Sequence, residues 1–248
     1  MLALMLAAGV GARLGAERPH PPKVLLRFGG RSLLARHLAI LRHFGIERLV
    51  ITKGYRGELI EAELNALSVD GFARTVFNPD FRAGSMMSLW AARDWLTSGH
   101  ELLLMDADVL YDHRLMARLV ESRHENCFLL DRDFEPGEEP VKLGVRDGVL
   151  VDFERRIDAP YEFCGESVGF FRLSSAMGAK LVDTMGRYVT AGRADRWYEA
   201  AIRDLLRDTD AGTFGWEEVT GLPWIEIDFP EDVERAEREI LPRLKELP

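Results

Sequence analysis

Two pairs of carboxylates occur at the ends of apolar runs that lie far apart in the sequence. Asp106 and Asp108 follow one such run, and Glu226 and Asp228 alternate with isoleucines in another. Residues two apart on a β-strand point to the same side, so the two pairs can converge on one metal ion. Such a cluster suits phosphoryl-oxygen chemistry, because Mg²⁺ takes carboxylate ligands and neutralises phosphate charge. The alternative is that Asp108 and Asp228 cap helices, Asp228 doing so ahead of Pro230.

A glycine-rich turn follows the first apolar run, with the sequence Leu6-Ala7-Ala8-Gly9-Val10-Gly11-Ala12-Arg13-Leu14-Gly15. Small side chains leave backbone N–H groups open to phosphate oxygens. The turn lacks the Lys-Ser/Thr of a Walker A loop and the glycine spacing of a dinucleotide-binding fingerprint. It therefore predicts either a phosphate-binding loop of another kind or a plain turn that closes a strand.

Positive charge is concentrated near the start of the chain. Residues 1–56 contain ten Lys or Arg and two Glu, whereas the whole chain has a net charge of −9. A basic segment folded against acidic ones suits a small polyanion bound together with a divalent metal. The negative total argues against nucleic acid as a partner.

Other catalytic chemistries find little support in the sequence. No Ser-His-Asp arrangement is visible, and we expect the six histidines to lie on the surface or to be partly buried. Cys127 and Cys164 stand in dissimilar contexts, so we expect reduced, buried thiols and neither a disulfide nor a zinc module.

The elements that must position these residues alternate between apolar runs and stretches of helical period. This alternation predicts βαβ units around a parallel sheet. The expected strands are 2–6, 48–52, 74–78, 101–105 and 126–130, and the expected helices are 32–44, 58–67, 86–96 and 113–122.

The pattern changes after Asp131, where 141–145 and 149–153 flank Arg146-Asp147-Gly148, a strong hairpin signal. We interpret 131–216 as an acceptor-binding insertion within one domain that covers 1–248. The later expected elements are a strand at 167–172, helices at 174–188 and 196–207, strands at 213–219 and 224–228, and a helix from Pro230 towards Leu244.

The chain carries no signal for a membrane. The apolar start, 1–10, has no basic segment before it, so we expect a buried strand rather than a signal peptide. No later stretch approaches the roughly 20 apolar residues of a spanning helix. We therefore expect a cytoplasmic protein without membrane insertion.

The segment Leu-Ala-Ala-Gly-x-Gly-x-Arg-Leu, followed by Pro22-Lys23-Val24-Leu25, resembles the signature of nucleotidyltransferases. These enzymes join a nucleoside triphosphate to a phosphorylated acceptor and release pyrophosphate. The resemblance implies an α/β, Rossmann-like three-layer (GT-A-like) fold with a mainly parallel central sheet and a small antiparallel insertion. It also implies that the loop wraps the triphosphate and that Arg13, Lys23 and Asp108 are catalytic.

Further segments resemble the phosphocholine cytidylyltransferase-like branch of this superfamily. They are Asn78-Pro79-Asp80-Phe81, Gly84-Ser85-Met86-Met87-Ser88-Leu89, Asp106-Ala107-Asp108, Gly165-Glu166-Ser167-Val168-Gly169, Trp197-Tyr198-Glu199 and Trp224-Ile225-Glu226-Ile227-Asp228. Residues 78–89 also resemble molybdopterin cytidylyltransferases, and Ser85 stands where some phosphocholine relatives have Asn. The resemblance thus implies CTP as one substrate and leaves the acceptor more open.

The resemblance also implies a set of site residues. Mg²⁺ is assigned to Asp108, Asp228 and Glu226. For Asp106 two roles stay open, contact with the ribose or contact with water around the metal. The acceptor is assigned to Glu166, Tyr198 and Trp197, because aromatic rings and acids suit a cationic group. The nucleotide is assigned to Leu6, Ala7, Ala8, Gly9, Gly11, Arg13, Lys23, Gly54, Tyr55, Asn78, Ser85, Ser88 and Asp106.

The function that follows is the formation of a CDP-alcohol and pyrophosphate from CTP and a phosphocholine-like phospho-alcohol. The alternatives are a sugar-1-phosphate or inositol-phosphate nucleotidyltransferase, a non-catalytic nucleotide-binding module, and an NADP-binding reductase. A module without activity would have lost Arg13, Lys23 or an acidic site, and all of these are present. The sequence leaves open whether the chain forms a homodimer.

Overall fold

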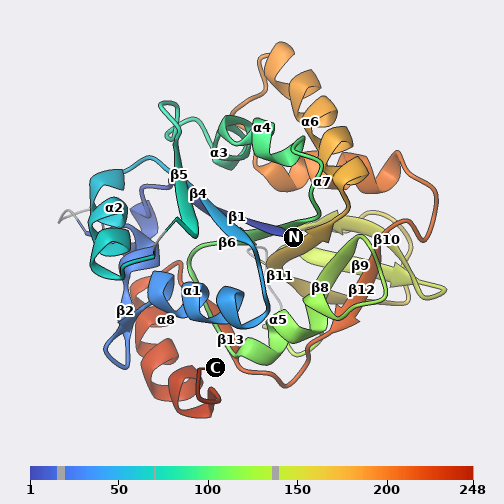
Figure 1. The fold of residues 1–248 in the computed structure, drawn as a ribbon. Helices are drawn as coiled ribbons and strands as arrows, with labels where there is room; N and C mark the ends of the chain where they lie inside the picture. Colours follow the sequence, from blue (N-terminus) through green and yellow to red (C-terminus); the bar gives the residue numbers. More distant parts are fainter. Residues whose placement is uncertain (16–19, 70, 136–139, 248) are drawn as a thin grey trace.

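A mixed sheet of nine strands runs through the part of the chain that the computed structural model describes, residues 1–15, 20–69, 71–135 and 140–247 (Figure 1). Its parallel half has the order β6-β1-β4-β5. The strands form as expected. The inner ones are continuous hydrophobic runs because both of their faces are covered, whereas the edge strand β5 is partly exposed. The bounds are β1 (Leu2–Ala7), β4 (Arg48–Lys53), β5 (Ala73–Phe77) and β6 (Leu102–Asp106).

The other half of the sheet is built around a long strand, β11, which pairs antiparallel with β6, β8 and β9. The predicted hairpin is confirmed, with Asp147 and Gly148 at φ 53° and 74° between β9 and β10. The sequence did not predict that β11 would separate β8 from β6. The bounds are β8 (Cys127–Asp131), β9 (Lys142–Arg146), β10 (Val149–Glu154), β11 (Phe163–Leu173) and β12 (Gly215–Glu218).

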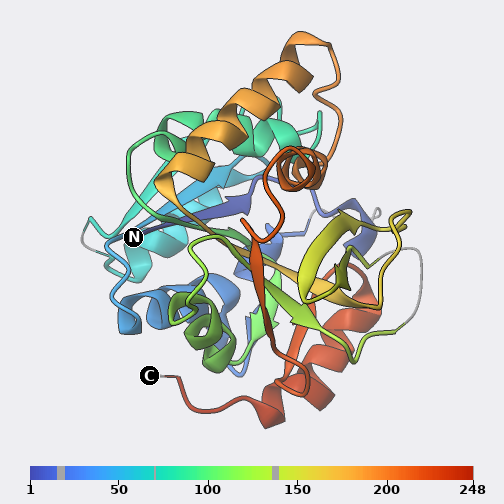
Figure 2. The same cartoon turned by 90° about the vertical axis from the view of Figure 1, so that its right-hand side faces the viewer.

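Helices cover both faces of the sheet and make a three-layer structure (Figures 1 and 2). Alternation along β1 sends Leu2 and Leu4 into one core and Ala3 and Met5 into the other. The first face is covered by α3 (Ser85–Ala91), α4 (Arg93–Leu96), α6 (Ser175–Thr190) and α7 (Tyr198–Arg207). The second face is covered by α1 (Leu33–His43), α2 (Gly57–Ala66) and α5 (His113–Val120).

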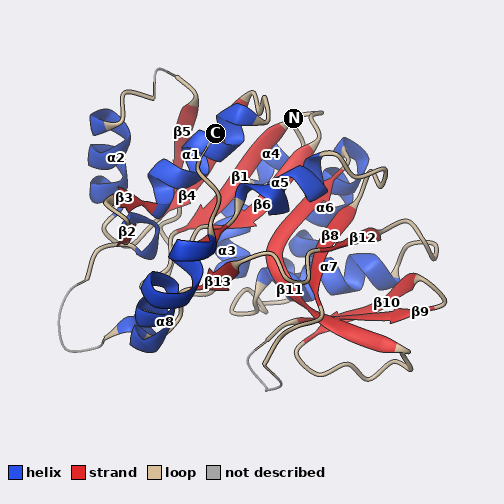
Figure 3. Cartoon of the chain, turned by 90° about the horizontal axis from the view of Figure 1, so that it is seen from below, coloured by secondary structure: helices blue, strands red, loops and turns tan. Residues whose placement is uncertain are grey.

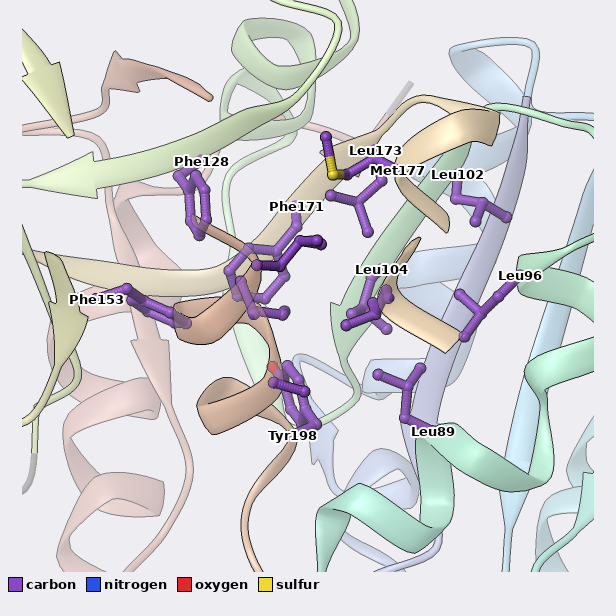
Figure 4. Close-up of a cluster of buried hydrophobic side chains, with 14 of the residues drawn as sticks. Leu89, Leu96, Leu102, Leu104, Phe128, Phe153, Phe171, Leu173, Met177 and Tyr198 are labelled. Atoms are coloured by element: carbon purple, nitrogen blue, oxygen red, sulfur yellow. The ribbon is translucent and has the colours of Figure 1, made fainter. Parts of the chain in front are cut away.

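Aromatic packing anchors the first core beneath the start of α7 (Figure 4). Phe128, Phe153 and Phe171 meet edge to face with centroids 5.1–5.8 Å apart. The ring of Tyr198 packs against Phe171 at 6.1 Å and is only 2% exposed. This packing fixes the N-terminal end of α7 against the sheet.

A small antiparallel pair lies outside the main sheet, formed by β7 (Val109–Tyr111) and β13 (Trp224–Glu226). The expected strand at 224–228 is therefore shorter, and Asp228 lies beyond its end. The last helix changes type along its length, because Pro242 lacks an N–H to continue an α-helical pattern. It comprises α8 (Pro230–Arg235), a π turn η3 (Ala236–Ile240) and a 3₁₀ turn η4 (Leu241–Arg243). Figure 3 labels β13 between the main sheet and α8.

Three further elements differ from the expectations. The helix predicted at 86–96 is two helices, because Ala92 leaves the helical region at φ −97° and ψ 13°. Two short strands, β2 (Arg27–Phe28) and β3 (Arg31–Ser32), form an unpredicted hairpin. Short 3₁₀ turns form at η1 (Ala12–Leu14) and η2 (Lys23–Leu25). Within the described ranges, no helix has both the length and the apolar character needed to cross a bilayer.

Candidate active site

The two carboxylate pairs meet because β7, the strand directly after β6, pairs with β13. Glu226 lies opposite Val109 in this pairing, and Ile227 N donates to the Asp108 carbonyl oxygen at 3.0 Å. Oxygens of Asp108, Glu226 and Asp228 consequently lie within 4.8 Å of one another. An all-oxygen cluster of this kind can hold a divalent cation.

Other residues occupy the capping positions that were the alternative roles of these aspartates. Asp112 caps α5 and accepts from Arg114 N at 3.0 Å. The carboxylate of Asp232 accepts from Asp228 N and Phe229 N at the start of α8, at 3.0 and 2.7 Å. The side chains of Asp108 and Asp228 instead belong to the cluster, where both pair with Lys23 and Asp228 also pairs with Arg13.

Lys23 bridges the cluster. Its Nζ donates to Asp108 Oδ2 at 2.9 Å and to Asp228 Oδ1 at 2.6 Å. Burial lowers the pKa of Lys23, but the two carboxylates outweigh burial and raise it above its usual value. Arg13 adds a contact to Asp228 Oδ2 at 3.2 Å and lies over the ring of Phe229, 5.5 Å from its centroid. Both cations from the basic N-terminal segment thus border the acidic cluster.

The carboxylates crowd one another strongly. The enclosing walls of the cleft, followed by the charges of Asp108, Asp106 and Asp228, raise the pKa of Glu226, whose side chain is exposed to solvent within the cleft. Burial, followed by Asp108 and Glu199, likewise raises the pKa of Asp106. Carboxylates this close to one another favour either a bound proton or a cation in addition to Lys23.

The glycine-rich turn has the close approaches that its sequence requires. Gly11 adopts φ +59°, and a Cβ there would lie 2.8 Å from the ring of His20. A Cβ on Gly54 would lie 2.8 Å from the Ala8 carbonyl oxygen, which accepts from Tyr55 N at 3.0 Å. Open space surrounds Gly9. The turn is therefore supported from behind and open towards the cleft.

The cleft consists of two adjoining chambers. The loop chamber, of about 450 Å³, is bordered by the glycine-rich turn, Arg13 and Lys23. The insertion chamber, of about 560 Å³, is bordered by Glu166 and other residues from the later part of the chain. The wall common to both is formed by Asp106, Arg155, Tyr198, Glu199, Glu226 and Asp228.

Most of the residues assigned to the nucleotide border the loop chamber. They are Leu6, Ala7, Ala8, Gly9, Gly11, Arg13, Lys23, Ser85, Ser88 and Asp106. Gly54, Tyr55 and Asn78 do not border either chamber. The first two support the turn, and buried Asn78 donates to Ser88 Oγ at 3.1 Å.

The residues assigned to the acceptor do not form one cage. Glu166 borders only the insertion chamber, where burial and then Asp131 raise its pKa to about 7. Trp197 borders the loop chamber, and the guanidinium of Arg155 lies over its ring, 3.7 Å from the centroid. Tyr198 is buried in the common wall and donates to Asp106 Oδ2 at 2.9 Å.

The site residues assigned from the sequence leave out three residues at or behind this site, although Glu199 belongs to the aromatic and acidic residues of the insertion. Glu199 and Arg155 belong to the common wall, and the available signals were an acid directly after an aromatic pair and a basic residue at a strand end. Gly169, at φ +77°, leaves room for Asp106, because a Cβ would lie 2.4 Å from its Oδ2. The role of each of these three residues depends on a contact with a residue that is distant in the sequence.

One histidine and one cysteine differ from what we expected. His37 is fully buried, and its Nε2 lies 3.1 Å from the Ala107 carbonyl oxygen. Burial lowers the pKa of His37 to about 4, so its ring is neutral at pH 7. Cys127 and Cys164 are both free thiols, but Cys164 is only partly buried.

Curated relatives of this chain include proteins named as synthases and as transferases. A CMP-5'-(3-aminopropyl)phosphonate synthase of Streptomyces rubellomurinus is 26% identical over 95% of this chain and 38% of its own length. A CTP:phosphoglutamine cytidylyltransferase of Campylobacter jejuni is 20% identical over 84% of this chain and 81% of its own length. A bifunctional IPC transferase and DIPP synthase of Rubrobacter xylanophilus is 28% identical over 96% of this chain and 52% of its own length. The chain thus spans about half or less of the first and third of these proteins.

Solved structures share the fold across nearly the whole chain. The inositol-1-phosphate CTP transferase from T. maritima has a TM-score of 0.75 at 23% identity and covers 99% of this chain and 96% of its own. The CTP:phosphocholine cytidylyltransferase LicC from Streptococcus pneumoniae has a TM-score of 0.74 at 20% identity, covering 95% and 96%. Residues 3–155 match the MobA-like NTP transferase domain, and because this is more than half of the chain, the protein belongs to that family of nucleotidyltransferases.

Proposed function

We propose that the chain is a magnesium-dependent cytidylyltransferase. It joins CTP to a phosphorylated amino-alcohol, the class that includes phosphocholine and phosphoethanolamine, and releases a CDP-alcohol and pyrophosphate. The observation that carries this proposal is the pair of chambers that share Glu226 and Asp228, whose oxygens lie within 4.8 Å of those of Asp108 in the loop chamber. Each substrate has its own chamber, and the reacting phosphates meet at the common wall.

The donor set fits Mg²⁺. Three carboxylates supply oxygen ligands only, and the ammonium of Lys23 already lies between two of them as a compensating cation. Bound there, the metal would supply charge neutralisation to the triphosphate and to the departing pyrophosphate. Asp108, Glu226 and Asp228 would hold it.

The chain's own residues act mainly by position and charge. The backbone of the glycine-rich turn and Arg13 bind the triphosphate, and Lys23 exchanges a carboxylate contact for a phosphoryl oxygen. An oxygen of the acceptor phosphate, already ionised, bonds to the α-phosphorus as the bond from the α-phosphorus to the bridging oxygen breaks. No general base is needed, and His37, whose Nε2 lies on the Ala107 carbonyl oxygen, borders neither chamber.

The names of the similar proteins support cytidine as the base. CTP or CMP occurs in the names of the Streptomyces and Campylobacter relatives and of both structural neighbours. Their second substrates differ from one another, so the names leave the acceptor of this chain to be argued from its own residues.

The insertion chamber supports a cationic acceptor. Nine carboxylates and two guanidinium groups line its described walls, so its potential favours a positive group. A neutral sugar would require amide and hydroxyl donors, yet residues 131–216 contain neither Asn nor Gln. The acceptor phosphate would lie at the common wall near Lys23, and the cationic end would lie among the acids.

A pyrophosphate-release screen tests the proposal. CTP, UTP, ATP and GTP are each paired with phosphocholine, phosphoethanolamine, 2-aminoethylphosphonate, glycerol phosphate, inositol phosphate and glucose 1-phosphate, with Mg²⁺ present. We expect turnover with CTP and an amino-bearing acceptor, and none from a parallel preparation of Asp108→Asn. Faster reaction of inositol phosphate, the substrate in the name of the T. maritima neighbour, would overturn the acceptor assignment. If none of the four triphosphates supports turnover, the proposed function is overturned.

A further inference from the structure

Glu199 carries a buried carboxylate oxygen that the fold does not satisfy. The residue lies in the first turn of α7 and borders both chambers. Its Oε2 is inaccessible to solvent and has no hydrogen-bond partner among the described residues. Buried acceptors of this kind are rare in native proteins, because losing water without gaining a donor is costly.

The surroundings of Glu199 do not remove this cost. Burial raises the pKa of Glu199 to about 7, although its own backbone N–H and the charge of Arg155 both favour the ionised form. The guanidinium of Arg155 is stacked on Trp197. A donor from a bound molecule is therefore the natural partner for Oε2.

Among the cationic acceptors proposed above, only one that carries an N–H can donate to Oε2, which separates two kinds of acceptor. A primary ammonium has three N–H donors, whereas a quaternary ammonium has none and is bound through aromatic faces. The two aromatic residues before Glu199 are already engaged. One face of Trp197 is covered by Arg155, and Tyr198 packs against Phe171 with its hydroxyl on Asp106.

We propose that Glu199 Oε2 accepts a hydrogen bond from a primary ammonium group of the acceptor, so that the enzyme selects aminoalkyl phosphates or phosphonates over their trimethylammonium counterparts. The inference rests on the proposed function and narrows its acceptor class. Glu199 is then a specificity-determining residue, and Glu166 adds a longer-range charge from the insertion chamber. The phosphoryl end of such an acceptor is common to phosphates and phosphonates.

Steady-state kinetics with paired acceptors test the inference. Phosphoethanolamine and phosphocholine differ only in the three N-methyl groups, and 2-aminoethylphosphonate separates a phosphonate from a phosphate. With the wild type at saturating CTP, we expect kcat/KM to favour phosphoethanolamine at least tenfold, which corresponds to about 1.4 kcal/mol. Glu199→Gln should reduce this ratio to below threefold and leave the KM for CTP unchanged.

Glu154→Gln provides a matched control. Glu154 lies near the same wall but pairs with Arg203 at 2.7 Å and borders neither chamber. We expect this variant to keep the wild-type ratio. A wild-type ratio of one or less, or an unchanged ratio in Glu199→Gln, would overturn the role of Glu199.

Equilibrium binding keeps the two proposals separable. Calorimetric titration of phosphoethanolamine and phosphocholine into the wild-type protein needs no turnover. Tighter binding of phosphoethanolamine that is lost in Glu199→Gln supports the ammonium site even if no pyrophosphate forms, in which case the proposed reaction fails alone. Equal binding of the two ligands refutes the ammonium site, and the wild-type comparison holds even if the variant does not fold.

Discussion

Glu166 is destabilising in its ionised form, and replacing it with Gln should stabilise the protein in a pH-dependent way. Glu166 is on β11 and lies opposite Asp131 of β8 and Lys142 of β9. Burial, then Asp131, raises its pKa from 4.5 to about 7. Between these two values the unfolded chain binds fewer protons than the folded one, so the free energy of unfolding falls as pH rises through this window.

The size of the effect follows from the pKa. At about 1.36 kcal/mol per pKa unit, ionisation of Glu166 costs the fold about 3 kcal/mol above pH 7. Gln has nearly the same shape and no charge to desolvate. At roughly 2–4 °C per kcal/mol for a chain of this size, Glu166→Gln should raise Tm by roughly 6–12 °C at pH 8. At pH 4.5 or below, where the folded wild type is protonated at this position, the gain should vanish.

Thermal melts of the wild type and variant at pH 4.5, 6, 7 and 8 provide the assay. The control is Glu218→Gln on β12, whose exposed side chain keeps its water in the fold and should show no pH-dependent gain. In Glu166→Gln, the KM for a cationic acceptor should rise and the KM for CTP should not. A gain in Tm that is equal at pH 4.5 and pH 8, or a loss at pH 8, would refute the reasoning about burial.

Three further predictions concern the acidic cluster and its supports. Lys23→Ala should lower kcat by roughly 100-fold and change CTP affinity less than tenfold, because a cation near the attacked phosphorus gains most in the transition state; kinetics together with calorimetry measure the two, and a defect confined to KM would contradict it. Asp108→Asn and Asp228→Asn should each lower kcat by roughly 100-fold or more with an unchanged circular dichroism spectrum, and EDTA should abolish wild-type activity until Mg²⁺ is restored; a near wild-type rate at saturating Mg²⁺ would remove either residue from the metal site. His37→Leu should raise the Mg²⁺ concentration for half-maximal rate, since the ring holds the Ala107 carbonyl between the two aspartates, and His37→Gln, which keeps a donor, should restore much of the loss; equal Mg²⁺ titrations for both variants would exclude this positioning role.

The local features of this protein are those that the sequence determines. The expected strands become β1, β4, β5, β6 and β8 within a residue or two. All of them except the edge strand β5 are largely buried runs of continuous hydrophobic sequence. The hairpin between β9 and β10 follows from its Asp-Gly pair, which tolerates positive φ. The glycine-rich turn and its nearby cations were also visible as a pattern of neighbouring residues.

Contacts between distant residues are what only the tertiary structure decided. The metal-type cluster depends on the pairing of β7 with β13, two strands of three residues each that have too little sequence to signal a partner. The buried state of His37 and the unsatisfied oxygen of Glu199 depend on what α1 and α7 are packed against. Burial and charge at a site are sums over neighbours from many segments, so a one-dimensional pattern supplies the candidates and the fold determines their pKa values, partners and ligands.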